Sequence, residues 1–106
     1  MPGKIVSSRM KPVPDRAEVA IEFPDKAYWG TFSSSARYEV KTDASGVTLK
    51  LERHDDAKRM VELHLHYDLF AALLEDMADA LAPSTALDEL HRDLVKKAAA
   101  KLAKAL

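Results

Sequence analysis

The chain has no cysteine among its 106 residues. Disulfide bonds, thiol catalysis, cysteine-ligated zinc and iron–sulfur clusters are therefore excluded. It has only three glycines, and they do not form a phosphate-binding loop. No apolar run approaches the ~20 residues that a membrane-spanning helix needs, and the first residues lack the apolar segment of a signal peptide. We therefore expect a cytoplasmic protein without a membrane partner.

Charge is low overall but uneven along the chain. The net charge of −1 divides into +3 for residues 1–16, −6 for residues 17–82 and +2 for residues 83–106. An acidic middle repels phosphate backbones, so it disfavours nucleic acid as a partner unless the basic ends or one local face supply the cations. The length and the 47% hydrophobic content are typical of a single globular domain.

Four segments alternate apolar and polar residues, as half-buried strands do: residues 16–23, 31–40, 46–53 and 60–67. Between the first two, residues 24–30 are expected to form a turn that carries Tyr28 and Trp29. Residues 1–15 are proline-rich and without periodicity, so we expect a flexible N-terminal arm. The pattern predicts one α+β domain over residues 16–106, with a four-stranded antiparallel meander over residues 16–67.

Charge pairing predicts the register of the last three strands. Residues directly opposite in an antiparallel pair share a face, and like charges there are unfavourable. Placing Leu51 opposite Val61 sets Lys50 against Glu62, and placing Tyr38 opposite Leu51 sets Glu39 beside Lys50. The intervening loop of residues 43–46 then offers Gly46 for a left-handed position.

Beyond Tyr67 the apolar spacing changes from two to three or four residues, which predicts helices at 68–82 and 85–105. We expect the order ββββαα, with the first helix packed on one sheet face. The last helix carries a leucine and alanine stripe that offers a surface for a homodimer or another protein partner.

His64 and His66 point the same way from one strand, an arrangement that can ligate a transition metal. Asp43 is the candidate third ligand. The predicted register places His64 opposite Thr48, far from His54, and makes both histidines part of a solvated face that Lys41 also occupies. Surface histidines without a metal are therefore the favoured interpretation.

Aromatic side chains beside basic ones suggest stacking of single-stranded bases. The candidate residues for such a site are Tyr28, Trp29, Phe32, Arg37, Lys41 and Lys50. Four antiparallel strands followed by a helix resemble the PUR repeat and the PC4-like coactivators in element order over residues 16–81, which implies single-strand binding. The acidic middle of the chain opposes this hypothesis.

No catalytic residue and no cofactor motif is identified, because the serines at 33–35 lack a neighbouring base and paired carboxylates fall in loops or on a helix surface. The sequence thus favours a small non-enzymatic binding or interaction protein that self-associates. Single-stranded nucleic-acid binding and metal binding through His64 and His66 are the two alternatives.

Overall fold

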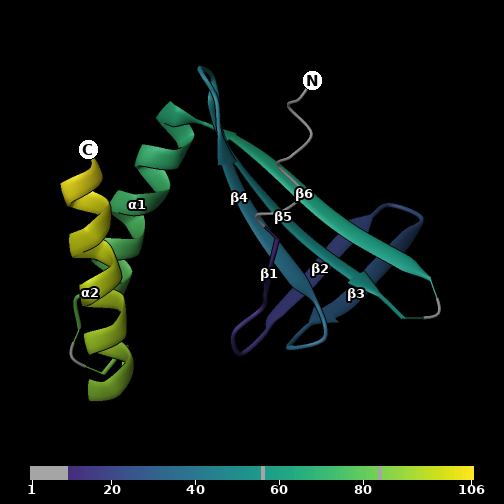
Figure 1. The fold of residues 1–106 in the computed structure, drawn as a ribbon, viewed down its shortest axis with the longest axis horizontal. Coiled ribbons are helices and arrows are strands. Elements are labelled where there is room, and N and C mark those ends of the chain that lie inside the picture. Colours follow the sequence, from purple (N-terminus) through teal and green to yellow (C-terminus); the bar gives the residue numbers. More distant parts are fainter. Residues whose placement is uncertain (1–9, 56, 84) are drawn as a thin grey trace. The chain divides into compact units, whose positions relative to one another are not determined.

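The computed structural model describes residues 10–55, 57–83 and 85–106, and the chain divides into two compact units at Tyr67 and Asp68. The first unit holds a four-stranded antiparallel sheet and a two-stranded sheet, and the second holds two helices (Figure 1). The α+β class predicted from the sequence is therefore confirmed.

The four-stranded sheet has the strand order β1-β4-β5-β6. Its members are β1 (Lys11–Pro12), β4 (Arg37–Thr42), β5 (Gly46–His54) and β6 (Lys58–His66). The predicted register is confirmed, since Tyr38 lies opposite Leu51 and Leu51 lies opposite Val61. Charge alternation along these strands was a sufficient guide because both hairpins have short loops that allow few alternative pairings.

The remaining two strands form a separate hairpin. In it, β2 (Ala17–Phe23) pairs with β3 (Lys26–Phe32), and Ala20 lies opposite Trp29. The predicted order is thus correct for β4, β5 and β6, although the strand predicted at residues 31–40 begins only at Arg37. It is wrong for the first strand, whose place in the sheet is taken by β1 from the predicted arm. Pro24 and Asp25 alone make the turn, so Tyr28 and Trp29 lie in a strand, as their β-propensity allows.

The core joins the hairpin to the apolar face of the sheet. Phe32 from β3 is buried together with Val13 and Ala36, and the apolar residues packed against them are Val19, Tyr38, Leu51 and Val61. The amide of Val13 donates to the carbonyl of Ala36, which anchors the segment after β1. Farther along the same sheet face, Val40 and Leu63 are each 52% exposed, so the hairpin covers only part of it.

Gly46 serves a purpose other than the left-handed conformation expected from the sequence. No described glycine has a positive φ, and the positive φ of 65° belongs to Asp15. A Cβ on Gly46 would lie 2.2 Å from the carbonyl oxygen of Leu65 and 2.9 Å from Cα of His66. Glycine is required there because the backbones of β5 and β6 approach each other closely.

The second unit consists of α1 (Tyr67–Leu81) and α2 (Glu89–Ala105), which run in opposite directions (Figure 1). Asp88 caps α2 by accepting a hydrogen bond of 2.8 Å from the amide of His91, so this helix begins four residues later than predicted. Arg92 donates to the carbonyls of Leu81 and Pro83. None of the helices in the described part of the chain is long and apolar enough to cross a membrane.

Candidate functional site

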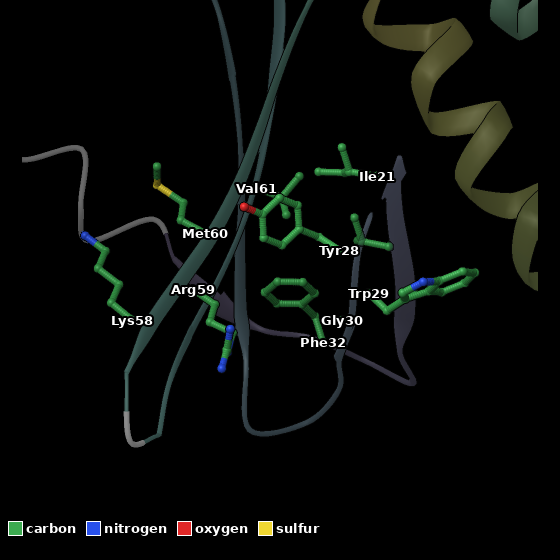
Figure 2. Close-up of a pocket in the computed structure, with 10 residues that line it drawn as sticks. Ile21, Tyr28, Trp29, Gly30, Phe32, Lys58, Arg59, Met60 and Val61 are labelled. Carbon is green, nitrogen blue, oxygen red and sulfur yellow. The ribbon is translucent and has the colours of Figure 1, made fainter. Parts of the chain in front are cut away.

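A cleft of about 310 Å³ lies between the β2–β3 hairpin and the first residues of β6 (Figure 2). Because successive side chains of a strand point to opposite faces, Tyr28 and Phe32 project from β3 into the cleft on the same side. Apolar side chains of β2 and β6 complete the walls, and they are Val19, Ile21, Met60 and Val61. The size and the aromatic lining are typical of a site for a small ring or an apolar side chain.

Cations lie over the aromatic rings of this cleft. The ammonium of Lys26 is 5.6 Å from the ring centroid of Tyr28, and the guanidinium carbon of Arg53 is 5.6 Å from that of Phe32. Arg53 also donates to the carbonyl of Thr31 and forms an ion pair of 3.3 Å with Asp55. The rim of the cleft is therefore positive.

The side chain of Trp29 points in a different direction from those of Tyr28 and Phe32, the other aromatic residues of the predicted stacking site. Its ring points away from Tyr28 and Phe32, and the residue is 82% exposed (Figure 2). Period-two alternation along β3 separates Trp29 from its two aromatic neighbours. The three aromatic side chains expected to form one stacking site thus divide between the two faces of the hairpin.

The three predicted basic residues of that site lie elsewhere. Arg37, Lys41 and Lys50 occupy the polar face of the four-stranded sheet, whereas Tyr38 and Val61 occupy the face that the hairpin covers. Arg37 lies opposite Glu52 and Lys50 opposite Glu62, while Lys41 lies opposite Thr48. The structure does not bring these cations to the aromatic residues.

The cations beside the aromatic cleft were missed by the sequence argument. They are Lys26, Arg53, Lys58 and Arg59. The sequence did contain one indication of two of these cations. In the predicted register, Arg53 and Arg59 lie opposite each other, at positions that share a face with Leu51 and Val61.

The turn between β4 and β5 brings together Asp43, Ser45 and His64. One carboxylate oxygen of Asp43 accepts hydrogen bonds from the Ser45 hydroxyl at 2.8 Å, the Ser45 amide at 2.8 Å and the Gly46 amide at 3.0 Å. These bonds to the charged form lower the pKa of Asp43 to about 2. Tyr67 donates from its hydroxyl to the Asp43 carbonyl, so the turn is tied to the end of β6.

The same cluster contains the residues predicted to hold a metal. His64 Nε2 lies 3.6 Å from Asp43 Oδ1, and the rings of His64 and His66 are 5.1 Å apart. Within residues 10–55, 57–83 and 85–106, no group of three or more histidine, aspartate or glutamate side chains is arranged to hold a metal ion. Metal binding at His64, His66 and Asp43 stays a prediction.

Asp43, Ser45 and His64 are also the residue types of a hydrolase triad, but the hydrogen bonds between them do not follow the sequence serine to histidine to carboxylate that catalysis needs. The Ser45 hydroxyl donates to Asp43 at 2.8 Å, while its separation from His64 Nε2 is 3.3 Å. A nucleophilic serine needs its proton directed to a histidine that a carboxylate orients. The hydrogen bonds here stabilise the turn instead.

The helical unit presents a second surface. Neither α1 nor α2 contains a buried residue. Four large apolar side chains are more than half exposed, namely Leu69, Met77, Leu90 and Leu94. A soluble helix usually buries one apolar stripe, so these four side chains offer apolar surface for packing.

Searches with protein-family models, curated proteins and solved structures found no match for this chain.

Proposed function

We propose that this protein is a non-enzymatic interaction module that forms a homodimer through its helical unit. The observation that carries the proposal is that two helices of 15 and 17 residues contain no buried residue between them. Isolated helices of this length are only marginally stable in water, and most helical stability comes from packing of an apolar face. A second copy supplies that packing.

The charges of the two helices favour a second copy as the partner. α1 carries four acidic residues and no basic one, whereas α2 carries five basic and two acidic residues. No ion pair joins α1 to α2 among the side chains that the structure describes. The complementary charges are therefore free to pair with another chain.

The positions of the charges explain why they do not pair within one chain. The acidic cluster Glu75, Asp76 and Asp79 lies in the C-terminal half of α1, and the lysines 96–104 lie in the C-terminal half of α2. Because the helices run in opposite directions, these halves lie at opposite ends of the hairpin (Figure 1). A two-fold axis perpendicular to the helices would make α1 parallel to α2 of the second copy and bring the two halves side by side.

Burial of the exposed leucines provides the main stabilisation in this arrangement. Full burial of a leucine or methionine side chain contributes roughly 1.5–3 kcal/mol, so covering Leu69, Met77, Leu90 and Leu94 from about half exposure contributes roughly 1 kcal/mol each per chain. The charge pairs add orientation more than affinity, since exposed ion pairs are weak.

Charge reversal and mixing test the proposal. We expect the E75K/D79K variant and the K97E/K101E variant each to dimerise roughly tenfold more weakly than the wild type in sedimentation equilibrium, because like charges then meet across the interface. Mixing the two variants is expected to restore wild-type affinity, since the α1 helix of each then meets an α2 helix of opposite charge. The K26E variant, in the hairpin, is the control and should dimerise normally.

The competing arrangement is the predicted packing of the first helix on the sheet of the same chain. It would give a monomer at micromolar concentration, and mixing the variants would change nothing. Either result contradicts the homodimer.

Single-stranded nucleic-acid binding is the second candidate function, and one observation favours it. Lys26 and Arg53 already lie over the rings of Tyr28 and Phe32, so a base entering the cleft would find apolar walls and cations for its phosphate. Titration of a fluorescein-labelled thymidine 12-mer tests it by anisotropy. We expect weaker binding by R59E and unchanged binding by R37E, whose side chain lies on the other sheet face; the absence of any salt-dependent binding would remove this candidate.

A further inference from the structure

The face of the β2–β3 hairpin that carries Trp29 has a composition suited to a ligand of its own. Besides Trp29 it contains Glu18, Ala20, Glu22, Ala27 and Thr31, since these residues share one parity in the paired strands. Tyr28 and Phe32, with the cleft, lie on the opposite face (Figure 2). The indole of Trp29 is 82% exposed on this surface, so its ring is accessible to a ligand.

The neighbours of Trp29 leave its ring open. Ala20 lies directly opposite, and Ala27 and Thr31 are the nearest same-face residues along β3. All three are small, so the indole has room on both sides for a flat group.

Two carboxylates flank the indole diagonally. Glu18 lies opposite Thr31, and Glu22 lies opposite Ala27, which puts both at diagonal positions to Trp29. Diagonal Cβ atoms in a sheet are about 7–8 Å apart, which is within reach of long side chains. Both glutamates are exposed.

The ring face of a tryptophan attracts cations, and the attraction is larger for indole than for the other aromatic rings. A carboxylate on each side adds acceptors for the N–H groups of a guanidinium, and hydrogen bonds to charged groups are stronger than those between neutral groups. Arg16 already shows that a guanidinium fits beside this face, with its Nε 3.8 Å from the Glu18 carboxylate while both side chains stay largely exposed.

We propose that the Trp29 face binds an arginine side chain of a partner protein, with the guanidinium stacked on the indole and hydrogen-bonded to Glu18 and Glu22. The same carboxylates repel phosphates, so this face selects against nucleic acid even though it carries the most exposed aromatic residue of the hairpin. The site consists of residues of β2 and β3 only, and the proposal does not depend on the proposed homodimer.

Trp29 is the single tryptophan of the chain, so tryptophan emission reports on the surroundings of this one residue. The full-length protein is titrated with the capped peptide acetyl-Gly-Arg-Gly-Arg-Gly-amide, and the fluorescence of Trp29 is recorded at low and high salt. We expect a saturable change in emission and a Kd that rises with salt. The E18Q/E22Q variant should bind the peptide about fivefold more weakly than the wild type. The control variant E62Q loses a carboxylate on the four-stranded sheet instead, and it should bind the peptide as the wild type does.

Two further measurements complete the test. Calorimetric titration of W29A, which is expected to fold because the side chain is exposed, should show loss of peptide binding. A peptide with citrulline in place of arginine, which keeps the shape without the charge, should not bind. Equal binding by E18Q/E22Q and the wild type overturns the proposal, as does quenching of Trp29 by a thymidine 12-mer but not by the arginine peptide.

Discussion

Replacement of Gly46 by alanine is the sharpest test of the sheet geometry. The new Cβ would lie 2.2 Å from the Leu65 carbonyl oxygen, 1.2 Å inside the 3.4 Å at which ordinary contact begins. The three atoms nearest to this Cβ are the carbonyl oxygen and carbonyl carbon of Leu65 and Cα of His66. All three belong to the backbone of β6 and not to a side chain that can rotate away. The end of the β5–β6 ladder must therefore separate.

Two opposing effects set how much G46A changes the free energy of unfolding. Forcing an extra methyl group into a packed region costs roughly 1–3 kcal/mol. Alanine restricts the unfolded chain more than glycine does, which stabilises the folded state by about 0.5–1 kcal/mol. We therefore expect G46A to lower the free energy of unfolding by roughly 1–2 kcal/mol, which at a urea dependence of about 1 kcal/mol per molar lowers the urea midpoint by roughly 1–2 M.

Gly30 provides the matched control. A Cβ there would meet Cε1 of Phe32 at 3.7 Å, which is ordinary contact, and Gly30 also lies in a strand with an unremarkable φ. We expect G30A to unfold at the wild-type midpoint or slightly above it, followed by far-ultraviolet circular dichroism. Equal midpoints for G46A and G30A would refute the close approach of β5 and β6.

Three further changes test individual residues. D43N should unfold at lower urea than the wild type above pH 4 and at the same urea near pH 2, because the folded state lowers the pKa of Asp43 from 3.8 to about 2, so its stabilising charge is lost as pH falls through that range. D15G should unfold at the wild-type midpoint or above it while D15V loses about 1–2 kcal/mol, since residue 15 has a φ of 65°. D88A should lower helical ellipticity at 222 nm relative to the control variant D93A, which removes a carboxylate from within α2, because Asp88 is the residue that caps the helix.

Local pattern was sufficient to predict several elements. The alternation in residues 37–66 contains both the strands and their register, because opposite charges at Lys50 and Glu62 distinguish one pairing from its neighbours. The change of period after Tyr67 likewise located α1, since a 3.6-residue repeat is a property of the segment itself.

The candidate site was predicted only in part. Tyr28, Trp29 and Phe32 all border one cleft, but the ring of Trp29 points away from the other two (Figure 2). The expected cations lie on the polar face of the four-stranded sheet. A wrong turn assignment at residues 24–30 hid the alternation that separates these aromatic residues, and the cations Arg53 and Arg59 were not connected to a hairpin that was not foreseen.

The sequence by itself determined the positions of β2, β5, β6 and the two helices, together with the charge clusters on α1 and α2, because these depend on spacing along the chain. Only the tertiary structure decided which strands share a sheet, that Lys11 and Pro12 fill its outer place, and that Gly46 is needed for close contact with β6. Those outcomes depend on surfaces from distant segments fitting together, and a pairing between residues far apart leaves no periodic signal in the chain.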